Sequence, residues 1–362
     1  MERSRVWKFL WLGILSGVVT FCILWGREPT KRQQEVVSSP AAVSDAPTEQ
    51  TNAREETATA DPLQTEEALH VPVFHVQISP LPTESMAPAP TVPAKEPFSL
   101  LWFSDTQVYS YKYPEVFLAM TDWANSVYRE YGSLAVVHTG DIVDNHNYAR
   151  HWIHAENAIL RLSGDLPFLC VAGNHDVGAS EPDYTQYRAY GFCAVKDEAD
   201  TYLDGVCWSH EFKAQNLLLV GIGWQTGTEY LDWVRERLLC YPNHTAILLV
   251  HSFLTDEGNL TATGKKLEQE ILSRHPNVRL VLCGHNDGSA LWSKTYEEGQ
   301  RTVHAMMYNF QDDKKHGLGY VRVLMFHPET RNIAVTTYSP YLDDYNYHKE
   351  ESKDTFTLKN AF

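Results

Sequence analysis

The sequence predicts a layered α/β domain that begins near residue 98 and continues to residue 362. Short apolar runs that end in polar residues or glycine recur through this region: FSLLWFS (98–104), SLAVVHTG (133–140), LPFLCVAG (166–173), NLLLVGIG (216–223), TAILLVHS (245–252) and VRLVLCGH (278–285). Four amphipathic stretches typical of helices lie between several of these runs, at 114–132, 149–164, 228–239 and 264–275. Strands that alternate with helices favour a layered architecture of sheets and helices. Near the end, residues 317–340 predict an antiparallel hairpin that turns at 328–331.

The composition is that of a folded globular protein that does not bind nucleic acid. Hydrophobic residues make up 43% of the 362 residues and aromatic residues 12%, which is enough for a sizeable core. The formal net charge is −16, and the sequence contains no basic stripe. Because nucleic-acid binding needs clustered Lys and Arg, we expect no nucleic-acid partner.

The six cysteines are too few for a disulfide scaffold. Cys193 and Cys207 flank a polar connection, and they are the one pair for which a disulfide is considered. The sequence has no C-x-x-C pair, so a cysteine zinc site is not expected.

The first 26 residues predict a short cytoplasmic tip and a transmembrane signal-anchor. The apolar stretch 6–25 is long enough, as a helix, to span a bilayer of about 30 Å, and tryptophans lie towards both of its ends. The alternative is a cleaved signal peptide, but the stretch exceeds the usual h-region of about 7–15 residues and no A-x-A-like site follows. We expect a single-pass protein of the cell membrane, with the following domain on the extracytoplasmic side.

Residues 27–97 predict a disordered linker. They are rich in Pro, Ala, Thr, Glu and Ser, and such a composition buries too little apolar surface to offset chain entropy. The domain organisation expected from the sequence is therefore an anchor (1–26), a linker (27–97) and one folded domain (98–362).

Five of the apolar runs end in side chains that can bind metals. These side chains are Asp105 and Gln107, Asp141 and Asp144, Asn174 and His175, His251, and finally His285 and Asp287. In open α/β sheets, functional groups gather beyond the carboxyl ends of the strands. One such pair is a weak signal, but five that each close an apolar run predict a shared metal site.

With these motifs, GDxxD, GNHD, a lone His and GHxD, residues 98–345 resemble the calcineurin-like metallophosphoesterases. The resemblance implies a four-layer α/β/β/α sandwich with a dinuclear metal centre at one edge. It also implies a ligand set, in which Asp141 bridges the two ions, Asp105, Gln107 and Asp287 bind the first ion, and Asn174, His251 and His285 bind the second.

The chemistry expected of such a centre is phosphoester hydrolysis. Two divalent ions held close together need an anionic oxygen between them, and the pair can clamp a phosphate and lower the pKa of a bound water, so that hydroxide attacks phosphorus. His175 is the candidate proton donor to the leaving oxygen, and Asp144 is expected to orient it by accepting a hydrogen bond. His146 is a candidate substrate-binding residue, and a surface-loop residue is the alternative.

The chain departs from the commonest family pattern at two positions. Gln107 and Asp287 stand where histidines are usual, and both belong to the first predicted ion. An all-oxygen shell suits hard cations, so we expect Mn²⁺ or Mg²⁺ there and Mn²⁺, Fe or Zn²⁺ at the second site.

Together these features predict a membrane-anchored hydrolase that acts on a small phosphorylated substrate, either a phosphomonoester or a phosphodiester. We expect loops, mainly 177–206 and 286–316, to form the pocket that decides between these substrates. The departures at Gln107 and Asp287 also fit a rival, a catalytically degenerate module that binds a phosphorylated cell-surface ligand. Both replacements can still bind a metal, and His175 with Asp144 is intact, which favours the enzyme.

Overall fold

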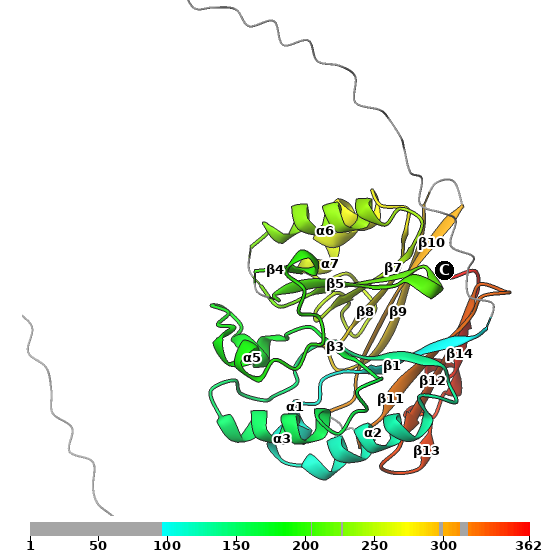
Figure 1. Ribbon diagram of the computed structural model, residues 1–362. Helices are drawn as coiled ribbons and strands as arrows, with labels where there is room; N and C mark the ends of the chain where they lie inside the picture. Colours follow the sequence, from blue (N-terminus) through cyan, green and yellow to red (C-terminus); the bar gives the residue numbers. More distant parts are fainter. Residues whose placement is uncertain (1–95, 204, 226, 297–299, 312–317) are drawn as a thin grey trace, which may run out of the picture. The chain divides into compact units, whose positions relative to one another are not determined.

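The computed structural model describes residues 96–362 apart from residues 204, 226, 297–299 and 312–317 (Figure 1). The predicted anchor and nearly all of the predicted linker lie outside the described residues. Among the residues that are described, no helix combines the length and the apolar character needed to cross a membrane.

The first sheet has the strand order β13–β12–β11–β1–β2–β3, with β14 also paired to β12. Its strands are β1 (Phe98–Phe103), β2 (Ser133–His138), β3 (Phe168–Cys170), β11 (Val321–His327), β12 (Asn332–Ser339), β13 (Asp344–Tyr345) and β14 (Phe356–Leu358). Strands β1, β2 and β3 are parallel, so their carboxyl ends meet at one edge, whereas β11 pairs antiparallel to β1. The hairpin of β11 and β12 is the one predicted from the sequence.

The second sheet has the order β4–β5–β6–β7–β8–β10–β9. Its strands are β4 (Thr201–Tyr202), β5 (Cys207–Phe212), β6 (Leu217–Ile222), β7 (Thr245–Val250), β8 (Val278–Cys283), β9 (Gly288–Tyr296) and β10 (Arg301–Asn309). Strands β6, β7, β8 and β10 are parallel. Three of the runs that end in functional groups or glycine therefore finish at the same edge of this sheet.

Helices cover the sheets on their outer sides. They are α1 (Gln107–Tyr111), α2 (Pro114–Val127), α3 (Ala149–Ile159), α4 (Asn174–Val177), α5 (Thr185–Tyr190), α6 (Tyr230–Cys240) and α7 (Ala262–Leu267), the last continued by a π-helical turn (Glu268–Leu272). Figure 1 shows α2 and α3 beside the first sheet and α6 and α7 beside the second.

Strand β1 shows how the layers are held together, because it is buried on both faces. Leu100 and Trp102 belong to a core cluster shared with strands of the second sheet. Leu101 and Phe103, which point the other way, belong to the cluster that includes Phe117 of α2. Burial of both faces explains why the run reads as continuously apolar. The mixed α/β fold with two sheets is as predicted.

One sequence-based expectation is wrong within the described residues, and one open question is answered. The sequence predicts loops over 286–316, but residues 288–296 and 301–309 form the antiparallel pair β9 and β10. β9 is an edge strand with many exposed polar side chains, so it lacks an apolar run. The disulfide considered for Cys193 and Cys207 is absent, since both are free thiols.

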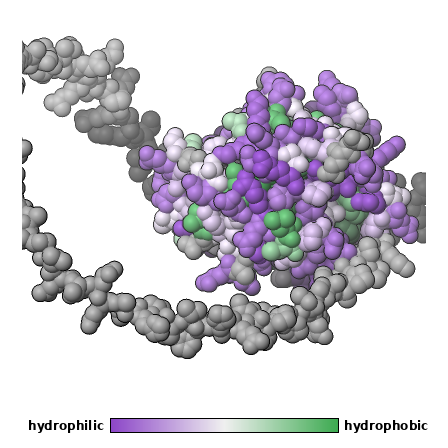
Figure 2. Space-filling model, turned by 90° about the horizontal axis from the view of Figure 1, so that it is seen from above, coloured by the Kyte–Doolittle hydropathy of each residue, from purple (hydrophilic) through white to green (hydrophobic). Residues whose placement is uncertain are grey.

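The surface of the domain is mainly hydrophilic. Figure 2 shows hydrophobic side chains only as small, separate patches on the face turned to the viewer. This distribution agrees with the formal net charge of −16.

Candidate metal centre

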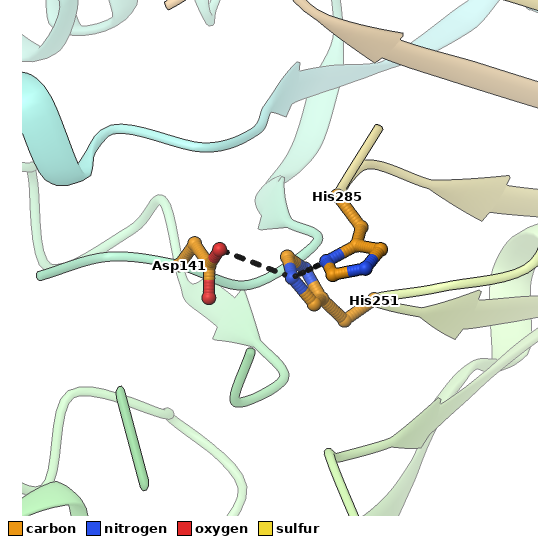
Figure 3. A group of neighbouring side chains, drawn as sticks. All are labelled: Asp141, His251 and His285. Atoms are coloured by element: carbon orange, nitrogen blue, oxygen red, sulfur yellow. Dashed lines mark hydrogen bonds and ion pairs between the residues drawn. The ribbon is translucent and has the colours of Figure 1, made fainter. Parts of the chain in front are cut away.

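Residues from both sheets meet at the edge where the parallel strands end. Asp105 and Asp141 follow β1 and β2, and His251 and His285 follow β7 and β8. Figure 3 shows the His251 ring between the Asp141 carboxylate and the His285 ring. The predicted convergence of strand ends is therefore present at the level of side chains.

His251 is at the centre of this cluster. Its Nε2 lies 3.2 Å from Asp141 Oδ2, 3.1 Å from His285 Nδ1 and 3.1 Å from Asn174 Oδ1. Its Nδ1 donates to the Thr139 carbonyl at 2.8 Å, which leaves Nε2 facing the other groups. One ligand atom from each of Asp141, His251 and His285 lies within 4.8 Å of the others. Converging electron pairs of this kind repel one another unless a cation or a proton lies between them.

Asp105 and Gln107 line the neighbouring side of the cluster. Asp105 accepts hydrogen bonds from the His285 backbone N–H at 3.1 Å and from the Ser104 hydroxyl at 2.5 Å. Gln107 Nε2 donates to Asp141 Oδ2 at 3.3 Å, while its Oε1 is buried with no hydrogen-bond partner among the described residues. An orphaned buried amide oxygen beside two carboxylates fits a cation ligand, because burial without a partner is costly.

Asp287, the third residue expected at this first site, lies in the turn between His285 and β9, and its side chain is exposed. The structure therefore brings Asp105, Gln107 and Asp141 together, while Asp287 lies two residues after His285 in the chain.

Two glycines allow the close approach of the ligand-bearing segments. A Cβ on Gly173 would lie 2.1 Å from Asp141 Oδ1, and a Cβ on Gly284 would lie 2.0 Å from Asp105 Oδ2. Neither distance is possible for a real side chain, so only glycine fits at these positions. The second contact joins the two sheets, since Gly284 follows β8 and Asp105 follows β1.

Burial and mutual charge shift the pKa values of the cluster. Burial raises the pKa of Asp105 to about 8 and lowers that of His285 to about 4. Burial opposes charge on His251 and Asp141 too, but their attraction outweighs it, so the pKa of His251 rises to about 9 and that of Asp141 falls. Without a cation, the raised pKa of His251 therefore favours its protonated form. A bound metal ion would take the place of this proton.

Asp176 holds the loops that carry the first-sheet ligands. Its buried carboxylate accepts from the backbone N–H groups of Ile142 and Val143 at 2.8 and 2.9 Å, and from that of Gly173 at 2.8 Å. It therefore ties the loop after β2 to the loop after β3 as a turn-stabilising acid, which fixes the positions of neighbouring ligands.

His138 connects the loops after β1 and β2. Its Nδ1 accepts from the Gly140 backbone N–H at 3.1 Å, so its Nε2 carries the proton and donates to Thr106 Oγ1 at 3.0 Å. Burial lowers the pKa of His138 to about 3, which keeps the ring neutral. The sequence placed His138 in a strand but gave no sign of this connection.

The predicted catalytic pair makes a different contact from the one expected. His175 Nδ1 donates to the backbone carbonyl of Asp144 at 2.7 Å, whereas the Asp144 carboxylate lies 3.9 Å away. The half-exposed His175 ring therefore presents Nε2 towards Asp141, with 4.0 Å between Nε2 and Oδ2. His146 lies beside this pair, and its backbone N–H donates to the His175 carbonyl at 3.2 Å.

Trp224 is a site residue that the sequence analysis missed. It follows Gly223 at the end of β6, and its ring centroid lies 5.8 Å from that of His251 and 5.4 Å from that of His285. Its Nε1 donates to the Ala179 carbonyl at 3.0 Å. Trp224 directly follows an apolar run, as the candidate ligands do, but an indole ring is not a metal ligand.

A family profile matches this region of the chain. The calcineurin-like phosphoesterase profile matches residues 98–286, which include all of the candidate ligands except Asp287. The chain therefore belongs to the calcineurin-like phosphoesterase family, as the motifs indicated.

Several known proteins are similar to this chain. It is 31% identical over 283 residues to the uncharacterized protein YvnB of Bacillus subtilis (strain 168), a match that covers 74% of this chain but only 22% of YvnB. The purple acid phosphatase PPD1 from yellow lupin seeds has the same type of fold, with a TM-score of 0.51 and 13% identity over 74% of this chain and 55% of that one. GAP50, the anchor in the inner membrane complex of Plasmodium, matches with a TM-score of 0.47 and 11% identity, over 73% of this chain and 89% of that one.

Proposed function

We propose that the domain hydrolyses a phosphomonoester or phosphodiester with the help of two divalent metal ions. The observation that carries this proposal is the convergence of Asp141, His251 and His285, whose ligand atoms lie within 4.8 Å of one another. Family membership and the orphaned Oε1 of Gln107 support it.

The proposed ligand assignment is the one that the family resemblance implies. Asp141 lies between the two groups of donors and is proposed to contact both ions. Asp105, Gln107 and Asp287 are proposed for an oxygen-rich site that favours Mn²⁺ or Mg²⁺, and Asn174, His251 and His285 for a site that favours Mn²⁺, Fe or Zn²⁺. When bound, the ions would neutralise the phosphate charge and supply the nucleophile by lowering the pKa of water.

His175 is proposed to assist the leaving group. Its Nδ1 is occupied by the Asp144 carbonyl at 2.7 Å, so Nε2 is the nitrogen that can carry a transferable proton. The ring is partly exposed at the edge of the cluster, where a leaving oxygen can be reached. Asp144 then acts as a positioning residue through its main chain, and His146 is proposed as a nearby contact to the substrate.

We also propose that residues 6–25 anchor the chain in the cell membrane and that the domain lies on the extracytoplasmic side. The support is the length and apolar composition of this stretch. Protease treatment of intact cells tests this: the domain should be cleaved if it faces outward and protected if it faces the cytoplasm.

The enzymatic proposal is tested with the full chain, purified in mild detergent, stripped with chelator and then given Mn²⁺, Mg²⁺, Ca²⁺ or Zn²⁺ separately. Hydrolysis of p-nitrophenyl phosphate and of bis-p-nitrophenyl phosphate is followed for the wild type and for Asp141→Asn. Asp165→Asn is the matched control, since Asp165 is an exposed acid whose ion-pair partner is Arg129, at 3.6 Å, and not a proposed ligand.

We expect metal-dependent turnover that falls at least about 100-fold in Asp141→Asn but not in the control. The loss of a ligand should lower turnover more than the loss of a residue that only hydrogen-bonds to a ligand. Preference for one ester would define the substrate class. A folded chain that binds metal and turns over neither ester would favour the alternative, a module that binds a phosphorylated ligand.

A further inference from the structure

A cavity of about 230 Å³ opens directly beside the metal cluster. His251 and Ser252, at the end of β7, form part of its wall, and other parts come from Trp224, Tyr230, Thr263 and Lys266. Because His251 belongs both to the cluster and to the cavity wall, the cavity adjoins the place where a phosphate held at the cluster would lie.

Trp224 fixes the border between the cluster and the cavity. Its ring contacts both histidines of the cluster, edge-on to His251 at an interplanar angle of 72° and tilted by 39° against His285. Its backbone N–H donates to the Ala172 carbonyl, and its ring N–H donates to the Ala179 carbonyl. An aromatic wall held at both ends provides a flat apolar face for a substituent.

Lys266, another lining residue, lies on helix α7. This helix is tied to the segment after His251, because the Thr261 backbone N–H donates to the Phe253 carbonyl at 3.0 Å and Thr261 Oγ1 caps the helix through the Gly264 N–H. The carbon that a side chain would add at Gly264 would lie 2.2 Å from the Phe253 carbonyl oxygen, so the helix packs closely against that segment. Lys266 therefore has a defined position relative to His251.

The charge of Lys266 is not neutralised by an ion pair within the described part of the chain. The described lining of the cavity contains no Asp or Glu. The charge of Lys266 acts on Glu229, an exposed carboxylate outside the lining, whose pKa is lowered first by hydrogen bonds from the backbone of Glu229 and Thr228 and then by Lys266. Lys266 is half-buried, whereas its neighbour Lys265 is exposed and is not part of the lining.

We propose that this cavity selects phosphate esters that carry a second anionic group, and that Lys266 binds that group while Trp224 covers the connecting part of the substrate. The inference deepens the proposed function, on which it rests, by naming a substrate class. A half-buried lysine without an ion pair among the described residues is suited to an anion.

The test measures binding and not turnover. Calorimetry compares phenylphosphonate with its 2-, 3- and 4-carboxy derivatives, which do not hydrolyse, on the Mn²⁺-loaded full chain. The variants are Lys266→Ala and, as the matched control on the same helix, Lys265→Ala.

We expect at least one carboxy isomer to bind more tightly than phenylphosphonate to the wild type and to Lys265→Ala, and this advantage to fall about fivefold in Lys266→Ala, the size expected for a partly exposed ion pair. The proposal is overturned if no isomer binds more tightly, if the advantage survives in Lys266→Ala, or if that variant weakens phenylphosphonate equally, since Lys266 would then bind the phosphate itself. A chain that binds these ligands as expected but hydrolyses no ester would remove the proposed activity and leave this site in place.

Discussion

The two sheets supply chemically different groups to the candidate metal centre. The loops after β1, β2 and β3 contribute carboxylate and amide oxygens, from Asp105, Gln107, Asp141 and Asn174. The loops after β7 and β8 contribute imidazole nitrogens, from His251 and His285, and one proposed carboxylate ligand, Asp287.

Neither half is a satisfactory site without the other. Burial raises the pKa of Asp105 to about 8, with a smaller contribution from the charge of Asp141, while the charge of His251 from the second sheet opposes this rise. Burial, and to a smaller extent the charge of His251, likewise lowers the pKa of His285 to about 4. The candidate ligand set therefore forms only when the two sheets pack together, and no single loop provides it.

The substitution that should break this pairing most strongly is Gly284→Ala. The new Cβ would lie 2.0 Å from Asp105 Oδ2, so the loop after β8 must move away from the first sheet. We expect metal-dependent turnover to fall about 100-fold or more, the size of effect that a displacement of about 1 Å can have at a catalytic site.

The measurement is kcat/KM on p-nitrophenyl phosphate, with circular dichroism to check folding. Gly164→Ala is the matched control, because a Cβ there meets no atom within 4 Å. Turnover of Gly284→Ala within a few-fold of wild type would show that the contact between the sheets is not tight.

The next substitution sharpens the comparison by altering only the oxygen-rich half. Gln107→Leu keeps the volume of the side chain but removes Oε1, the buried oxygen with no hydrogen-bond partner among the described residues. We expect Mn²⁺ affinity at one of the two sites to weaken about 10- to 100-fold, while the other is retained.

Metal content after dialysis against graded Mn²⁺, read by mass spectrometry, checks this result. Gln269→Leu, which changes an exposed glutamine, is the control. Unchanged occupancy of both ions in Gln107→Leu would exclude Gln107 as a ligand.

The smallest effect is expected from Ser104→Ala. Ser104 Oγ donates to Asp105 Oδ2 at 2.5 Å and also contacts Thr139 Oγ1, which in turn accepts from the Trp102 indole at 3.0 Å. Loss of one hydrogen bond to a buried carboxylate should lower kcat/KM about threefold to tenfold.

The exposed Ser126→Ala serves as its control. Because Ser104 acts through Asp105, its loss should also shift the Mn²⁺ concentration needed for half-maximal activity. A fall in rate without such a shift would argue against a positioning role.

The sequence predicted the strands that carry ligands because each is buried on both faces and reads as an unbroken apolar run. It placed Asp105, Asp141, His251 and His285 at converging strand ends, and the structure brings these residues together. Strand β9 could not be recognised in this way, since an edge strand with an exposed face needs no apolar run.

The contacts that support the candidate ligands could not be predicted from the sequence either. Asp176 and His138 act through backbone groups of other loops, and no spacing in the chain encodes such contacts. Trp224 was missed because a tryptophan after a strand most often packs in a core, and its contact with two histidines depends on how three loops come together.

Three candidate ligands have left-handed backbone conformations, with φ of 51° at Asp105, 57° at Asp141 and 74° at His285. An L-residue other than glycine is about 1–2 kcal/mol less stable in this region, so the three positions together destabilise the fold of the ion-free chain. Glycine would relieve this strain at each position but would remove a ligand. Ions that bind only the folded chain restore stability in proportion to their affinity and concentration. Substitutions that would raise thermal stability at these three positions would therefore remove candidate ligands. The thermal stability of the chain should consequently depend on the concentration of metal around it.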